Sequence, residues 1–145
     1  MTSRERLLAA VRRQPVDPSY AAEYRNWEHV AGGEAIVRCR LFGALDNQAG
    51  LALPLEEIMV NYMTKRDFPD RLLRMFGDQI HEQTKALLEE GVRVFSLSDY
   101  WCSLSAGWSP LIYRDWFFPI LKSQVELIHE YDGIVFYYCD KITFM

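Results

Sequence analysis

The sequence has little positive charge, few cysteines and no long hydrophobic run, and each of these shortages excludes a class of protein. Its 145 residues include 16 Lys and Arg against 20 Asp and Glu, a net charge of −4. A chain without a basic excess has no surface that neutralises phosphates, so we expect no nucleic-acid partner. The hydrophobic run from Trp116 to Leu121 has six residues and contains Pro119, and no run is longer, whereas a membrane span needs about 20. We therefore expect no membrane partner.

The three cysteines, Cys39, Cys102 and Cys139, are too few and too scattered for a disulfide scaffold. A reducing cytoplasm is therefore the expected location. The sequence does hold enough apolar material for a core, because 50% of its residues are hydrophobic and 14% are aromatic. These proportions predict one soluble globular domain over residues 1–145.

The first part of the chain divides in two. Thr2 and Glu5 have the spacing of a capping box, which predicts a short amphipathic helix over residues 3–14. Pro15 and Pro18 are expected to end it, so that residues 1–18 form an N-terminal helix with its stop. Residues 19–34 show no sustained hydrophobic period and are interpreted as a loop or a weak helix.

Strand and helix patterns alternate from residue 35 onward. Residue composition predicts strands over 35–42, 92–98 and 134–138. Helical spacing predicts helices over 54–63, from Pro69 until Gly91, and from Ser109-Pro110 to residue 128, with a kink or break at Pro119. This order is typical of right-handed βαβ units, so the expected fold class is α/β, with a βαβαβ segment of parallel strands over 35–145.

Candidate site residues follow the ends of these strands, where chemistry collects in parallel α/β folds. They are Gly43 and Ala44 after the first strand, Asp99, Tyr100 and Trp101 after the second, and Asp140 after the third. One role for Asp99 is to hold a polar ligand beside the aromatic wall of the two rings that follow it. The other is to cap the loop by accepting hydrogen bonds from nearby backbone amides. The sequence leaves both roles open.

Cys102, Cys139 and Asp140 raise the question of a metal site. Zinc requires a tetrahedral set of cysteine, histidine or carboxylate ligands, and the sequence contains none of the spacings C-x-x-C, H-x-C or H-E-x-x-H. We therefore expect no metal, and no other cofactor is indicated.

Several of these segments follow one another in an order found in a known superfamily. The order runs from Arg12-Arg13-Gln14-Pro15-Val16-Asp17 through Gly43-Ala44, Phe68-Pro69, Ser98-Asp99-Tyr100-Trp101 and Ser109-Pro110 to the strand that ends at Cys139-Asp140. In this order the chain resembles the uroporphyrinogen decarboxylase superfamily. The resemblance implies a (β/α)8 TIM barrel, which needs about 250 residues. We therefore expect a partial barrel of about three strands, preceded by the short N-terminal helix and truncated internally and at its C-terminus.

The resemblance implies a protein that handles a tetrapyrrole or corrinoid, as a carboxy-lyase or as a methyltransferase of the same superfamily. It implies a catalytic role for Asp99 and a substrate-binding role for Gly43, Ala44, Tyr100, Trp101 and Asp140. Some family positions differ. Tyr100 stands where the decarboxylase has a serine, and Tyr138-Cys139-Asp140 stands where the methyltransferase branch has a zinc-binding His-x-Cys pair. Since the decarboxylase's arginine-containing loop also has no counterpart, we expect that this chain is not catalytically self-sufficient.

A second hypothesis comes from a different functional class. It is a non-catalytic truncated relative that acts as an oligomerising or partner-binding module, or a gene fragment. Three parallel strands with a few helices leave sheet edges and apolar surfaces uncovered. Under this hypothesis we expect a homo-oligomer or a complementing fragment, with Trp116, Phe117 and Phe118 on the exposed surface.

Overall fold

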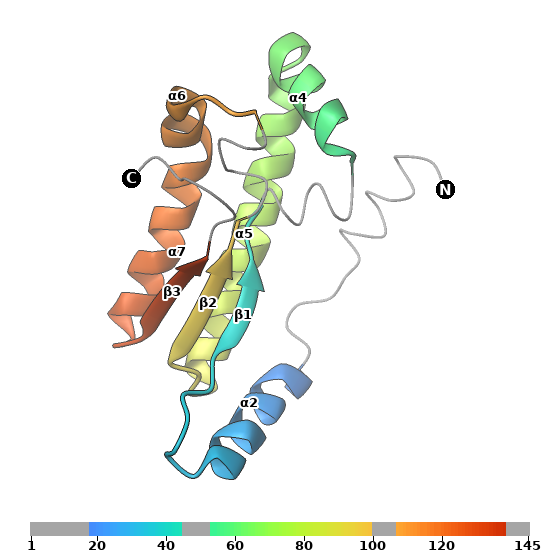
Figure 1. Ribbon diagram of the computed structural model, residues 1–145. Coiled ribbons are helices and arrows are strands. Elements are labelled where there is room, and N and C mark those ends of the chain that lie inside the picture. Colours follow the sequence, from blue (N-terminus) through green and yellow to red (C-terminus); the bar gives the residue numbers. More distant parts are fainter. Residues whose placement is uncertain (1–17, 45–52, 100–106, 139–145) are drawn as a thin grey trace.

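Strands and helices alternate along the described part of the chain (Figure 1). The computed structural model describes residues 18–44, 53–99 and 107–138. The elements are, in chain order, α2 (Pro18–Ala31), β1 (Cys39–Phe42), α4 (Leu55–Thr64), α5 (Asp67–Glu89), β2 (Val94–Ser98), α6 (Pro110–Ile112), the π-helix η2 (Tyr113–Phe117), α7 (Phe118–Glu130) and β3 (Ile134–Tyr138). The helix predicted over residues 3–14 lies outside the described residues.

Within the described residues, the three strands form one open parallel sheet. Its order is β1-β2-β3, so each strand pairs with the next strand along the chain. Helices α5 and α7 both lie on one face of the sheet (Figure 1). The predicted α/β class with three parallel strands and crossover helices is confirmed.

Helix α5 forms because its apolar residues recur every three or four positions. The residues that it buries are Pro69, Leu72, Leu73, Phe76, Gly77, Ile80, Thr84, Leu87 and Leu88. Gly91, with a φ of +95°, follows the end of the helix, as expected for a glycine at this place. Within the described residues, none of the helices is both long and apolar enough to cross a membrane.

Alternation along the strands gives the sheet two different faces. In β2, Phe95 and Leu97 turn toward the helices and share a core cluster with Leu88 of α5 and Ile128 of α7. Burying each such side chain contributes about 1.5–3 kcal/mol. The alternate residues point to the opposite side, on which Figure 1 shows no described helix. We call this side the open face; it carries Arg40 of β1, Ser96 and Ser98 of β2, and Ile134, Phe136 and Tyr138 of β3.

Of the two interpretations of residues 19–34, the helix is confirmed for most of the segment and the loop is wrong there, because Pro18–Ala31 is the helix α2. Its hydrophobic period is hard to read because, among its side chains that the structure describes, only Ala21 and Tyr24 are buried, while Trp27 and Val30 continue the same spacing but are exposed. Pro18, which we expected to end a helix, begins this one. Proline suits that position because the N–H groups of a first helical turn have no partner within the helix.

The irregularity expected at Pro119 takes the form of the π-helix η2. The Phe118 N–H donates to the carbonyl oxygen of Tyr113, five residues back, instead of the four of an α-helix. Pro119 has no N–H and falls in the first turn of α7, where none is needed. The backbone therefore stays helical through Phe117 and Phe118, and one π-helical turn precedes the proline.

The expectation that Trp116 and Phe117 are exposed is wrong. Trp116 is 7% exposed and Phe117 is 5% exposed, whereas Phe118 is 44% exposed. The two buried rings belong to an aromatic cluster that also contains Tyr62 and Trp108. In it the Trp116 ring lies 4.6 Å from Tyr62 and 5.5 Å from Trp108 between centroids. These contacts join α4 and the segment before α6 to η2, so the burial comes from packing between segments that are distant in the sequence.

Candidate functional site

The backbone joins the residues that follow the strands at the carboxyl edge of the sheet. The Gly43 N–H donates to the Ser98 carbonyl oxygen at 2.8 Å, and the Asp99 N–H donates to the Tyr138 carbonyl oxygen at 3.3 Å. These two hydrogen bonds continue the sheet beyond its last strand residues. The ends of all three strands therefore meet at one edge, as parallel pairing requires.

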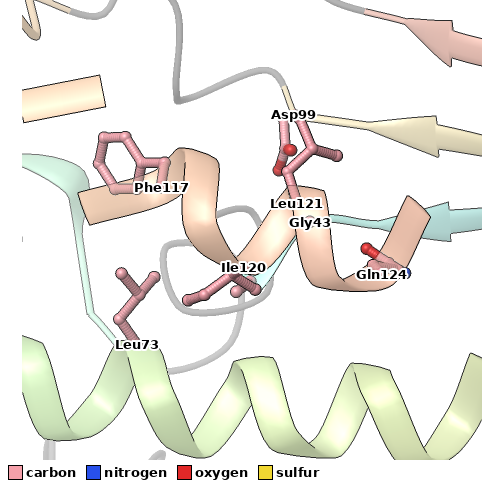
Figure 2. Close-up of a pocket in the computed structure, with 8 residues that line it drawn as sticks. Gly43, Leu73, Asp99, Phe117, Ile120, Leu121 and Gln124 are labelled. Carbon is pink, nitrogen blue, oxygen red and sulfur yellow. The ribbon is translucent and has the colours of Figure 1, made fainter. Parts of the chain in front are cut away.

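Asp99 is buried at this edge and turns toward the helices. It continues the alternation of Phe95 and Leu97, and it is only 6% exposed. Its carboxyl group lies directly against Gly43, where a Cβ atom would overlap it. Figure 2 shows the carboxyl group at the end of β2, on the side of α7. Glycine is therefore required at position 43 because the carboxyl group occupies the space of a side chain.

A small cavity lies beside the carboxyl group. Its lining comes from the sheet edge and both helices, and consists of Gly43, Ala44, Leu73, Asp99, Phe117, Ile120, Leu121 and Gln124 (Figure 2). Its volume of about 10 Å³ has room for about one water molecule. Most of the lining is apolar. The cavity can therefore hold a water molecule on the Asp99 carboxyl group, but it does not admit a macrocycle.

Gln124 lines the same cavity and is held by a buried hydrogen-bond chain. Its Nε2 donates to Oγ1 of Thr84 at 3.1 Å, and the Thr84 hydroxyl donates to the carbonyl oxygen of Ile80 at 2.8 Å. Both side chains are buried. Breaking the Gln124–Thr84 hydrogen bond would leave a buried polar group unpaired, at a cost of about 1–3 kcal/mol. This hydrogen bond therefore fixes how α7 lies on α5.

The structure brings together Gly43, Ala44 and Asp99 among the predicted site residues, since all three line one cavity. Tyr100, Trp101 and Asp140 lie outside the described residues. The expected aromatic wall around Asp99 is therefore not part of the described site.

Metal-binding groups do not gather in the part of the chain that the structure describes. The described residues contain no group of three or more His, Cys, Asp or Glu residues that could hold a metal ion. Cys102 and Cys139 lie outside this part. Cys39 is buried in β1, and its burial, with a smaller effect of the Glu23 charge, raises the pKa of the thiol to about 11. A thiol with this pKa is protonated at neutral pH and is a poor nucleophile and ligand.

No protein-family model matches the chain, and no curated protein matches it. Among solved structures, it superposes on a methyltransferase from Methanosarcina mazei with a TM-score of 0.62 and 14% sequence identity. The match covers 79% of this chain and 33% of the methyltransferase. The two proteins share a fold over this region. The chain spans about a third of the length of that methyltransferase.

Sequence reasoning missed one polar contact, which lies on the open face. Nε of Arg40 donates to Oγ of Ser98 at 3.2 Å, between β1 and β2. The signal is present in the sequence, because Arg38 and Arg40 alternate with Cys39 and Leu41 and must therefore face away from them. We did not predict the contact because we treated the two segments that contain Arg40 and Ser98 as apolar strands.

Proposed function

We propose that this protein is a relative of the uroporphyrinogen decarboxylase superfamily that binds a tetrapyrrole or corrinoid and does not complete decarboxylation or methyl transfer alone. The observation that carries the proposal is the superposition on the M. mazei methyltransferase. The order of segments from Gly43-Ala44 to Ser98-Asp99-Tyr100-Trp101 supports the same superfamily. Tyr100 and Tyr138-Cys139-Asp140, which stand at positions where the superfamily has other residues, support the lack of independent catalysis, because catalytic groups act as a unit.

The burial of Asp99 favours one of the two roles that the sequence left open. Asp99 is only 6% exposed, and its carboxyl group lies against Gly43 beside a cavity with room for about one water molecule. A catalytic carboxylate must reach its substrate, whereas a carboxylate that fixes the strand ends need not. We therefore assign Asp99 as a positioning residue for this edge of the sheet.

Calorimetric titration of the purified chain with hydroxocobalamin and with coproporphyrin III tests the proposal. We expect one of these compounds to bind, and no conversion of uroporphyrinogen in a chromatographic product assay. Absence of binding by both compounds would remove the binding part of the proposal. Turnover by the chain alone would remove the second part.

Replacement of Asp99 by Asn tests its role, with Asp78→Asn on the exposed face of α5 as the matched control. We expect Asp99→Asn to lower the free energy of unfolding and to leave ligand affinity within about twofold. A loss of affinity of about tenfold, or roughly 1.4 kcal/mol, in a variant that remains folded would instead favour direct contact with the ligand.

A second candidate function is an oligomerising module, and the sheet edges favour it. Within the described residues, β1 and β3 each pair only with β2, and an unprotected edge strand is a template for pairing with another chain. The side chain of Ile134 at the start of β3 is 56% exposed. Light scattering should then give dimers or larger species, and a monodisperse 17.0 kDa monomer would contradict this function.

A further inference from the structure

The outer side of α5 carries charged side chains of both signs. The helix lies on one face of the sheet (Figure 1), so one of its sides points away from the core. Every charged residue or histidine between residues 67 and 85 is exposed or half-buried. They are Asp67, Asp70, Arg71, Arg74, Asp78, His81, Glu82 and Lys85, and we call them the α5 stripe.

Most charges of the α5 stripe are not used within the chain. Opposite charges three or four residues apart on a helix can pair with each other. Asp70 does so with Arg66, at 3.3 Å between Oδ1 and Nε, but among the described residues no other member of the stripe takes part in an ion pair. Arg74 and Asp78, one turn apart at the middle of the stripe, are therefore available to a partner.

The order of charges along the stripe is complementary to itself when the helix is reversed. If two copies of α5 lie antiparallel about a two-fold axis at the level of residue 76, each residue faces the one equally far beyond that level. To within one residue, this arrangement pairs Arg74 with Asp78, Asp67 with Lys85, Arg71 with Glu82 and Asp70 with His81. The first three pairs have opposite charges. In the fourth, the ring N–H of His81 donates to the carboxylate whether or not the ring is charged.

The members of these pairs also lie on matching sides of the helix. Asp70 and His81 both line the groove between α5 and α7. A helix turns by about 100° per residue, which places Arg71 and Glu82 together on the other side of the stripe. A two-fold axis that lies between the helices, at right angles to them, keeps each residue on its own side. The charges therefore agree with the antiparallel arrangement both along the helix and across it.

An apolar patch lies beside the centre of the stripe. The groove between α5 and α7 contains two hollows of about 290 and 220 Å³, and Arg74, Pro119 and Ile120 line both of them. Ile120 packs on α5 at Gly77, where an added Cβ atom would lie 3.2 Å from its Cγ2 atom. Because Gly77 is next to the level of the axis, a second copy would bring its own Pro119 and Ile120 to this patch. Their contact would remove apolar surface from water.

We propose that two copies of the chain associate through α5, antiparallel about a two-fold axis at the level of residue 76, with Arg74 of each copy on Asp78 of the other. Charge complementarity selects this occupant, because a partner of a single charge would be repelled by part of the stripe. The interface uses neither the strand edges nor the carboxyl edge of the sheet. It is therefore independent of the ligand proposed above and differs from assembly through the sheet edges.

Sedimentation equilibrium with charge-reversal variants tests the interface. We expect the wild type to form dimers that dissociate as the salt concentration rises. Arg74→Asp and Asp78→Arg each place like charges opposite each other at two points, so each should weaken the dimer about tenfold or more. The double variant Arg74→Asp/Asp78→Arg exchanges the signs of both pairs and should regain the dimer. Arg38→Asp reverses an exposed charge before β1 and should change the dissociation constant by less than about twofold.

A mixture of the two single variants tests the antiparallel register. Arg74→Asp chains and Asp78→Arg chains have opposite charges in both central pairs when they meet, so an equimolar mixture should form a mixed dimer although neither variant pairs with itself. Circular dichroism confirms that each variant is folded. Dilution or high salt dissociates the dimer, and under these conditions Asp78→Asn remains a plain surface substitution, as its use as the control for Asp99→Asn requires.

Three results would overturn the proposal. The first is a wild type that stays monomeric at millimolar concentration. The second is a dimer that both charge reversals leave intact, as expected for pairing through the sheet edges or through another surface. The third is a mixture of the single variants that does not associate, because the central pairs would then not be those of the antiparallel arrangement.

Discussion

Replacement of Gly43 by Ala tests the close contact between the ends of β1 and β2. The added Cβ atom would overlap the Asp99 carboxyl group and would lie 2.9 Å from its Oδ2 atom. The φ angle of Gly43 is outside the left-handed region, so the backbone itself accepts alanine. The variant therefore reports on the contact alone.

The surroundings of the contact set its magnitude. The carboxyl group has little room to move away, because the adjoining cavity has a volume of only about 10 Å³, enough for about one water molecule. Overpacking at such a position costs about 1–3 kcal/mol. Urea unfolding followed by circular dichroism should show this loss in the free energy of unfolding of Gly43→Ala.

A double-mutant cycle with Asp99→Ala identifies the cause. When the carboxyl group is absent, we expect the cost of Gly43→Ala to fall by about 0.5–3 kcal/mol, the usual range for residues in contact. Gly91→Ala is the control, because Gly91 has a φ of +95° and no neighbour within 4 Å of an added Cβ. Its cost comes from the backbone and should be the same in both backgrounds. If Gly43→Ala costs as much without the Asp99 carboxyl group as with it, the contact does not determine the choice of glycine.

Other predictions concern the buried groups around the site. Trp116→Ala should cost about 3–5 kcal/mol in urea unfolding because it removes a buried ring, and Phe118→Ala, which truncates a half-exposed ring, should cost less than about 1.5 kcal/mol. Equal losses would contradict the burial difference. Thr84→Val should cost about 1–3 kcal/mol because it leaves the Gln124 amide without its acceptor, and adding Gln124→Met should recover part of that loss. In a chain with its other cysteines replaced by serine, alkylation of Cys39 should stay slow at pH 8 and accelerate toward its pKa of about 11. Folding raises this pKa, so the neutral Cys39 thiol contributes to the free energy of unfolding. This contribution is fully present below the pKa of the thiol in the unfolded chain, near 8.5, and is lost as the pH rises through 11. Mass spectrometry of the labelled chain and unfolding curves across this range check both statements, and rapid labelling of the folded chain at pH 8 would contradict them.

The order of strands and helices could be predicted because most elements repeat their apolar residues with one clear period. Helix α5 is the strongest case, since its buried stripe continues from Pro69 to Leu88. Helix α2 could be predicted only as one of two alternatives, because Ala21 and Tyr24 are the only buried residues among its described side chains. The burial of Trp116 depends on Tyr62 and Trp108, which are distant in the sequence, and no local pattern reports such contacts.

The candidate site was predictable only in part for the same physical reason. Parallel pairing brings the residues after the strands to one edge, and this rule correctly places Gly43 near Asp99. Asp99 alternates with Leu97, so its side chain points to the same side of the sheet. This alternation can be read from the sequence, but we did not extend it beyond the end of the strand. The size of the cavity depends on Ile120 and Leu121 of α7, and therefore on how that helix lies on the sheet.

The order β1-β2-β3 with parallel pairing has a consequence for symmetry. The two outer strands run in the same direction, so a parallel sheet that continues from one copy into another with the helices of both on the same face must join the outer edge of β3 to the outer edge of β1. Such a contact joins two different surfaces and leaves one unused surface at each end. A two-fold dimer would instead pair like edges, either with the strands antiparallel or with the strands parallel and the helices of the two copies on opposite faces. Assembly that keeps the helices on one face of a parallel sheet is therefore head-to-tail, and it ends only when the copies close into a ring.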